Sequence, residues 1–152
     1  MAISVGVLSD THGLLRDEVR SRLRGCSMII HAGDVGSLSV LTELRRIAEV
    51  VVVRGNVDTG PWAKELKPTE YVAIGDALIC VVHDLSTLEL DPVAAGVNVI
   101  IYGHSHRPVI EHKGGILYLN PGSAGPPRFR LPIGMALLRI DAEGVVPELI
   151  EL

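Results

Sequence analysis

Residues 3–13 read Ile-Ser-Val-Gly-Val-Leu-Ser-Asp-Thr-His-Gly, and this stretch decides how the rest of the chain is interpreted. Its first six residues are apolar or β-branched and predict a short buried strand, while the polar residues after them are typical of a loop. Leu15, Val19 and Leu23 then recur at helical spacing among charged residues. A strand, a polar loop and a helix in this order indicate an α/β fold.

The same alternation continues along the first half of the chain. Residues 28–31 predict a second strand, the apolar stripe from Val40 to Ala48 predicts a helix, and residues 50–53 predict a third buried strand. Strands that are joined through a helical crossover run parallel to one another. We therefore expect a parallel arrangement of these first strands.

The second half of the chain changes to short strands separated by Gly and Pro turns. Residues 71–74 and 78–82 predict a hairpin around Gly75-Asp76, and Asp91-Pro92 predicts the start of a short helix. Further strands are expected at residues 97–102, 109–112, 116–119, 135–140 and 145–149. We expect these strands to form a sheet packed against the first half, within a single domain of residues 1–152.

The composition limits the classes of partner. A chain of 152 residues with 47% hydrophobic residues can bury a substantial core. Its formal net charge of -4 argues against binding nucleic acid by broad neutralisation of phosphates, because that mode needs an excess of Lys and Arg. A nucleic-acid partner is therefore not expected, unless a local basic patch binds the phosphates.

Targeting signals and cysteines point to a soluble cytoplasmic protein. The first ten residues lack the basic region of a secretory signal, and no apolar run approaches the roughly 20 residues of a membrane-spanning helix. Cys26 and Cys80 are isolated, which fits reduced thiols, and Cys80 lies in an apolar run that predicts burial. No membrane partner is expected, and homo-oligomerisation is left open.

Residue types that bind metals follow nearly every predicted strand up to residue 102. They are Asp10, His12, Asp34, Asn56, His83, His104 and His106. Ligands of open α/β sheets collect outside the carboxyl ends of the strands. Each of these residues alone has a simpler interpretation, such as a helix cap or a turn. Those interpretations do not explain why two carboxylates, an amide and four imidazoles would all stand at the same end of one sheet.

The set has the chemistry of a two-metal site. Carboxylate and amide oxygens together with imidazoles hold divalent ions such as Mn, Fe, Zn or Ni. In Asp10-x-His12 and His104-x-His106 the two side chains would point to the same side of an extended segment. A shared carboxylate can bridge two ions about 3.5 to 4 Å apart, which suits phosphoryl transfer. The predicted reaction is the metal-assisted hydrolysis of a phosphoester.

The residues also lie in ordered motifs that resemble those of the calcineurin-like metallophosphoesterases, in the small YfcE/Vps29-like branch. The motifs are Asp10-Thr11-His12, His31-Ala32-Gly33-Asp34, Arg54-Gly55-Asn56-Val57-Asp58, Gly103-His104-Ser105-His106 and Asn120-Pro121-Gly122-Ser123. The resemblance covers essentially the whole chain. It implies an α/β fold of four layers, an α-β-β-α sandwich, and a phosphodiesterase that acts on a small phosphoester substrate.

The resemblance further implies how the residues divide their roles. One ion would be held by Asp10, His12, Asp34 and His106, and the other by Asp34, Asn56, His83 and His104. Asp34 would bridge two divalent ions, for which Mn²⁺ is expected and Fe, Zn or Ni are alternatives. A hydroxide between the ions would be the nucleophile. The residues expected to act in catalysis are Asp34, Asn56, His83 and His104, and those expected to bind substrate are Asn56 and Arg128.

Three polar residues in or near the motifs have more than one interpretation. His31 is either a histidine satisfied in the core or behind the ligands, which is favoured, or a ligand itself. Asp58 either orients a ligand histidine or closes a turn. Arg54 either contacts phosphate, as guanidinium groups do, or is solvated surface.

Two positions depart from the family pattern. Val57 stands where larger phosphatases of the superfamily have a histidine thought to assist the leaving group, and an isopropyl group cannot donate a proton. This predicts weak turnover on substrates with poor leaving groups. His83 is followed by Asp84-Leu85, whereas many relatives continue with Gly-His.

Two alternatives from other functional classes compete with the enzyme. One is a Vps29-like protein-interaction scaffold whose chemistry has lapsed, and the retained histidines argue against it. The other is a nuclease acting on polynucleotides, which the acidic charge disfavours.

Overall fold

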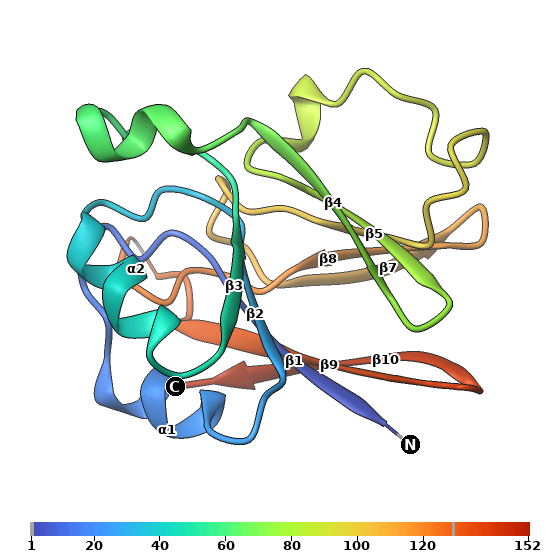
Figure 1. The fold of residues 1–152 in the computed structure, drawn as a ribbon, viewed down its shortest axis with the longest axis horizontal. Helices are drawn as coiled ribbons and strands as arrows, with labels where there is room; N and C mark the ends of the chain where they lie inside the picture. The colour runs from blue at the N-terminus through green and yellow to red at the C-terminus, as the bar shows by residue number, and fades with distance from the viewer. Residues whose placement is uncertain (1, 129) are drawn as a thin grey trace.

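The computed structural model describes residues 2–128 and 130–152 and folds them into two five-stranded β-sheets that pack face to face (Figure 1). Two α-helices cover the outer face of the first sheet. Among the described residues, no helix combines the length and the apolar character that crossing a membrane requires.

The first sheet contains the β-α-β units predicted from the sequence. Its strands are β1 (Ile3–Leu8), β2 (Met28–His31), β3 (Glu49–Val52), β9 (Gly134–Asp141) and β10 (Gly144–Glu151), in the order β10-β9-β1-β2-β3. Helices α1 (Asp17–Leu23) and α2 (Leu38–Arg45) connect β1 to β2 and β2 to β3, and these three strands are parallel as predicted. The pairing places the carboxyl ends of the three strands side by side.

The second sheet is mixed. Its strands are β4 (Thr69–Ile74), β5 (Ala77–Val82), β6 (Val99–Ile101), β7 (Val109–Lys113) and β8 (Ile116–Asn120), in the order β4-β5-β6-β8-β7. The predicted β4-β5 hairpin is confirmed, with Ile74 paired to Ala77 across the turn. Strands β5, β6 and β8 run parallel, so their carboxyl ends also share one edge.

Strands β9 and β10 correct the prediction that all strands of the second half share one sheet. Both strands join the first sheet, where β9 pairs antiparallel with β1 and sets Val5 opposite Leu138. The reason is burial, because Val5 is completely buried and β1 would be an exposed edge strand without β9. The end of the chain thus encloses the strand that carries the first metal-binding motif.

The outer layer on the second sheet is irregular. The 3₁₀ turn η2 (Leu85–Thr87) and the loop that follows it pack against buried residues such as Cys80 and Ile100. The short helix predicted after Asp91-Pro92 is wrong, because residues 92–96 form turns. Asp91 does cap this segment by accepting a hydrogen bond from the N–H of Val93, at 3.1 Å. A run of five residues before a glycine is too short to recover the cost of helix nucleation.

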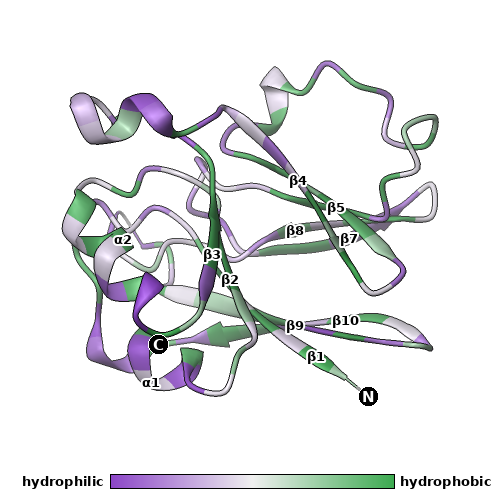
Figure 2. Ribbon diagram, viewed as in Figure 1, coloured by the Kyte–Doolittle hydropathy of each residue, from purple (hydrophilic) through white to green (hydrophobic). Residues whose placement is uncertain are grey.

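The main core lies between the two sheets. It includes Val7 and Ile30 from the first sheet and Ile79, Ile101 and Leu119 from the second, all of which are completely buried. A further cluster fills the space between the helices and the first sheet. Apolar residues therefore line both faces of the central strands, and Figure 2 shows these strands as the most hydrophobic part of the chain.

We predict that Ile101→Ala lowers the free energy of unfolding by about 2 to 5 kcal/mol, because it opens a cavity where the two sheets meet. Urea denaturation of the metal-free protein measures the change. Val93→Ala is the matched control, since Val93 is 66% exposed and its truncation is expected to cost under about 0.5 kcal/mol. Equal losses in the two variants would contradict this account of the core.

Candidate metal centre

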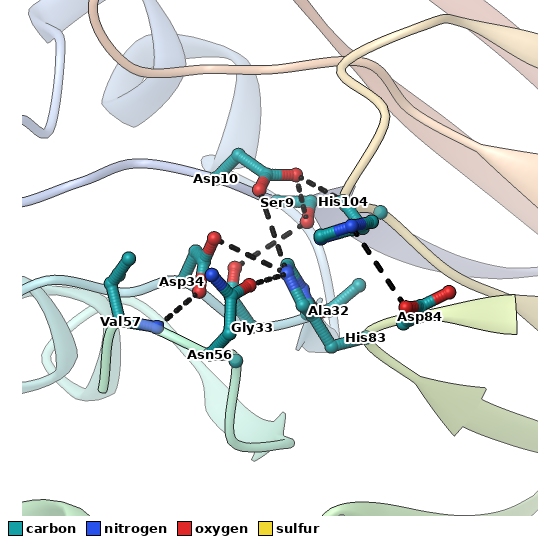
Figure 3. A network of polar contacts seen from close by, with 12 residues as sticks. Ser9, Asp10, Ala32, Gly33, Asp34, Asn56, Val57, His83, Asp84 and His104 are labelled. Carbon is teal, nitrogen blue, oxygen red and sulfur yellow. Dashed lines mark hydrogen bonds and ion pairs between the residues drawn. The ribbon is translucent and has the colours of Figure 1, made fainter. Parts of the chain in front are cut away.

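Loops from both sheets meet at one edge of the sandwich and bring predicted ligands together, and Figure 3 shows Asp10, Asp34, Asn56, His83 and His104 among them. The loops after β1, β2 and β3 supply Asp10, His12, Asp34 and Asn56, and those after β5 and β6 supply His83, His104 and His106. The sequence predicted one end of a single sheet. The structure instead gathers the residues at the seam between two sheets.

Left-handed backbone turns shape the loops that carry five of these residues. Among the described residues other than glycine, positive φ angles occur at Asp10, His12, Asp34, His104 and His106, with values between 47° and 71°. This conformation costs free energy in non-glycine residues and clusters at functional sites. The prediction that the Asp-x-His and His-x-His pairs lie on extended segments is therefore wrong. The chain turns at both residues of each pair, which brings His12 towards Asp10 and directs His106 at Asp10 while His104 faces Asp84.

Glycines let these loops approach one another closely. A Cβ atom at Gly103 would collide with Ser9 Oγ and with the Asp10 carboxylate, and one at Gly55 would collide with the backbone and carboxylate of Asp34. Only a residue without a side chain fits at these two points. The glycines of the Gly55-Asn56 and Gly103-His104 motifs thus have a steric role in building the centre.

Asp10 lies at the middle of the centre and is completely buried. Its Oδ2 accepts hydrogen bonds from Ser9 Oγ at 2.7 Å and from the N–H of His104 at 3.2 Å. Its Oδ1 instead faces His106 Nε2 at 3.4 Å and His12 Nε2 at 3.8 Å. The Nε2 of His83 lies 3.9 Å from the same Oδ1. One oxygen is therefore held by the protein, and the other is directed at three imidazoles.

Asp34 takes the corresponding position between two histidines. Its Oδ2 lies 3.2 Å from His83 Nε2 and 3.7 Å from His12 Nε2. Its Oδ1 accepts a hydrogen bond from the N–H of Val57 at 3.0 Å. The pKa of Asp34 falls to about 2 because the contacts with His83 and Val57 outweigh the opposing effect of burial. Burial dominates at Asp10 and raises the pKa of that carboxyl.

His83 connects the two sheets and faces both carboxylates. Its Nδ1 lies 2.7 Å from the carbonyl oxygen of Ala32, to which it donates. This leaves Nε2 directed at Asp34, at Asn56 Oδ1 3.1 Å away, and at Asp10 Oδ1 3.9 Å away. Burial alone would lower the pKa of His83, but the contact with Asp34 and the charge of Asp10 raise it. The carboxylates of Asp34 and Asp10 thus favour a positive charge near Nε2 of His83.

The ligand atoms form two overlapping groups that suit cations. One group is Asp10, His12 and His106, the other is Asp10, Asp34 and His83, and the ligand atoms of each lie within 4.8 Å of one another. Asp10 Oδ1, His12 Nε2 and both ring nitrogens of His106 are buried without a hydrogen-bond partner among the described residues. Such orphaned polar atoms are costly unless something binds them. The oxygen and imidazole donors fit two divalent metal ions.

Asn56, His104 and Arg128 lie at the rim of this arrangement. Asn56 is exposed and contacts His83, whereas the half-exposed His104 ring points its Nε2 at Asp84 Oδ2, 3.9 Å away. His104 is held near the centre through its backbone N–H and by its ring, whose centroid is 5.2 Å from that of His83. Arg128 is exposed. Burial lowers the pKa of His106, and the charge of Arg128 adds to that effect while Asp10 opposes it.

His31 supports the loops and is not directed at the ligands. It is completely buried, its Nε2 lies 3.0 Å from Thr11 Oγ1, and its Nδ1 accepts from the N–H of Gly33 at 3.1 Å. Because Thr11 Oγ1 donates to the carbonyl of Val35, Nε2 must be the protonated nitrogen. Burial lowers the pKa of His31 to about 3. The favoured prediction of a satisfied histidine behind the ligands is confirmed.

Asp58 closes the loops, which is the turn interpretation of this residue. Its carboxylate accepts hydrogen bonds from the backbone N–H groups of Val35, Gly36 and Gly55, at 3.2, 2.9 and 2.9 Å. These bonds join the loop after β2 to the loop after β3. Asp58 therefore fixes the two segments that carry Asp34 and Asn56.

Three supporting residues received no role from the sequence. Ser9 holds Asp10 Oδ2, Ser123 Oγ donates to the carbonyl of Asp10 at 3.0 Å, and Asn120 Nδ2 donates to the carbonyl of Gly103 at 3.1 Å. Asn120 and Ser123 belong to the Asn-Pro-Gly-Ser motif that the sequence showed. Their partners lie far away in the chain, so only the folded structure reveals what they bind.

Residues 3–143 match the calcineurin-like phosphoesterase superfamily domain, which is nearly the whole chain. The chain belongs to this superfamily. The fold and the family predicted from the motifs are thereby confirmed.

Individual relatives agree with this assignment. A protein named "Probable metallophosphoesterase" from Methanothermobacter thermautotrophicus is 34% identical over 96% of this chain and 91% of that protein. A protein named "Phosphodiesterase MJ0936" from Methanocaldococcus jannaschii is 29% identical over 79% of this chain and 83% of that protein. The structure of Vacuolar Protein Sorting 29 from Cryptosporidium parvum matches with a TM-score of 0.84 at 22% identity, over 99% of this chain and 92% of that chain. This last likeness shows the fold.

We predict that His31 makes the metal-free protein less stable in acid. The pKa of His31 is about 3 in the folded protein, whereas the ordinary value of 6.5 applies to the unfolded chain. Below pH 6.5 the unfolded chain therefore binds a proton that the folded protein does not. Stability then falls as the pH falls, by about 2 kcal/mol between pH 7 and pH 5. Urea denaturation across this range measures the slope.

His31→Gln is expected to lose that part of the slope, whatever its stability at pH 7. The matched control is His112→Gln, because His112 is exposed on β7. Its slope should equal that of the unmodified protein. If His31→Gln keeps the full slope, the neutral buried state of His31 is wrong.

Proposed function

We propose that the protein is a metal-dependent phosphodiesterase that hydrolyses small phosphoesters at a dinuclear centre, with Mn²⁺ as its expected ion. The supporting observation is the placement of two buried carboxylates, Asp10 and Asp34, among the ring nitrogens of His12, His83 and His106. The relative named as a phosphodiesterase supports the diester preference. The free thiols of Cys26 and Cys80 suit a reducing compartment, so we propose the cytoplasm.

Asp10, His12, Asp34, His83 and His106 would hold the ions, and Asn56 and His104 would complete their ligand sets. Bound divalent ions would supply Lewis acidity, which lowers the pKa of water and so provides a nucleophile near neutral pH. Asp34 is kept ionised by its contacts with His83 and Val57, so its charge would be available to hold the ions without first losing a proton.

The exposed rim would bind the phosphate group of the substrate. Asn56 presents its amide beside His83, and the positive charge of Arg128 acts from the side of His106. An amide N–H donates hydrogen bonds to phosphate oxygens, and a guanidinium donates them while also compensating their negative charge. Asn56 therefore lies beside the ligand group that contains His83, and Arg128 acts on the group that contains His106.

An interaction scaffold is a weaker account of the same residues. A scaffold has no need for buried ligand atoms that lack hydrogen bonds, nor for five strained non-glycine residues around them. The likeness to Vacuolar Protein Sorting 29 concerns the fold, at 22% identity.

We predict that the Mn²⁺-loaded protein hydrolyses bis(p-nitrophenyl) phosphate and that Asp34→Asn lowers kcat/KM by at least about 100-fold. The amide keeps the shape of the side chain but removes the charge that holds the ions. The release of p-nitrophenolate measures turnover, and plasma emission analysis of the same samples counts the bound metal.

Asp76→Asn is the matched control, because it removes the same charge at the exposed turn of the β4-β5 hairpin. This variant is expected to keep both its metal and its activity. If the unmodified protein shows no metal-stimulated turnover, the proposed function is wrong.

We predict that turnover falls steeply as the pKa of the leaving alcohol rises. Val57 stands beside Asp34, is 43% exposed, and has no proton to give to a leaving oxygen. A series of substituted phenyl phosphodiesters measures this slope. Val57→His should flatten it and raise kcat on the poorest leaving groups by up to about 100-fold, whereas Val57→Leu should not. A flat slope in the unmodified protein would show that another group already supplies the proton.

A further inference from the structure

A hollow of about 330 Å³ opens directly beside the proposed metal centre. Asn56, His83 and His104 line it on one side, and these residues belong to the centre itself. Its other walls include Pro68, Val82 and Thr87. A molecule whose phosphate sits on the metal ligands would therefore have this hollow within reach.

The outer walls offer mainly apolar contact. Pro68 is exposed and contributes hydrocarbon surface, whereas Val82 lines the hollow with only a small exposed area. The Thr87 hydroxyl is used internally, donating to the carbonyl of Asp84 at 2.7 Å. The Nδ1 of His83 is likewise occupied by the carbonyl of Ala32. Among Pro68, Val82 and Thr87, the Thr87 hydroxyl is the one polar side-chain group, and its proton is already used.

The charged residues of the hollow have opposite signs. Arg54 and Asp84 both line it, and one carboxylate oxygen of Asp84 already accepts from the N–H and Oγ of Ser86, at 3.0 and 2.8 Å. The charges of a guanidinium and a carboxylate in one small space partly offset each other, which weakens the attraction of the hollow for a charged ligand. The hollow suits an uncharged group.

We propose that this hollow binds one ester arm of the substrate, and that the arm is an uncharged aromatic or apolar group. The proposal rests on the proposed function and names the class of diester on which it acts. A phosphomonoester has only one organic arm, whereas a diester always has an arm available for the hollow as well as one outside it. Filling an apolar site with a ring favours binding by about tenfold to a hundredfold. The geometry therefore favours aryl and similar diesters over small alkyl diesters.

The test is calorimetric binding of diphenyl phosphate and dimethyl phosphate to the Mn²⁺-loaded protein. Both are diesters with one negative charge, and they differ in the size and apolar character of their arms. Diphenyl phosphate is expected to bind at least about tenfold more tightly. Thr87→Trp and Pro68→Trp fill the hollow from two elements of the structure, and each should reduce that ratio to within about twofold.

Val93→Trp is the matched control, because Val93 is exposed on the loop of residues 92–96 and does not line the hollow. It should keep the full ratio. Circular dichroism and metal analysis of every variant show whether it is folded and loaded. The two filling variants are independent, so misfolding of one leaves the other as the test.

Equal binding of the two diesters by the unmodified protein would overturn the proposal, as would an unchanged ratio in a folded and loaded filling variant. Turnover of bis(p-nitrophenyl) phosphate is recorded in parallel. If turnover is present and the aromatic preference is absent, only the arm site fails. If turnover is absent, the proposed function itself fails.

Discussion

Two carboxylates, Asp10 and Asp34, are buried within reach of the same histidines, and much of the structure serves to hold them there. Buried charges of one sign are unstable unless cations or protons compensate for them. In the protein alone, His83 supplies part of that compensation, which is why its pKa is raised. Divalent ions would supply it more completely. The site is therefore arranged around a need for positive charge.

The position of this site follows from how the two sheets meet. The parallel strands of each sheet end at the same edge, and His83 Nδ1 binds the carbonyl of Ala32 across the seam. Asn120 and Ser123 bring a third segment to the same place by holding the backbone of Gly103 and Asp10. Each ligand depends on contacts made by another loop. Metal binding and the folding of this edge are thus expected to be coupled.

Much of the fold could be predicted because its signals are local. The β-α-β pattern of residues 3–53 and the hairpin around Gly75-Asp76 follow from periodicity and turn chemistry, and the structure contains both. The partner of β1 could not be predicted this way. Val5 pairs with Leu138 because β1 would otherwise be an exposed edge strand, and which strand lies at the edge is known only once the sheet has assembled. The same limit applies to His104, whose ring direction depends on Asp84 from another loop.

By itself, the sequence determined which residue types are available and the order in which loops deliver them. The seven predicted ligands and the glycines beside them were visible in the motifs, and so was the family. Only the tertiary structure decided that these loops come from two sheets, that left-handed turns aim Asp10 and His106 inward, and that His31 stands behind the ligands. The physical reason is that burial, pKa and close approach arise between segments that are distant in the chain. Asp10 becomes a buried acceptor with one free oxygen only when Ser9, His104 and Ser123 surround it.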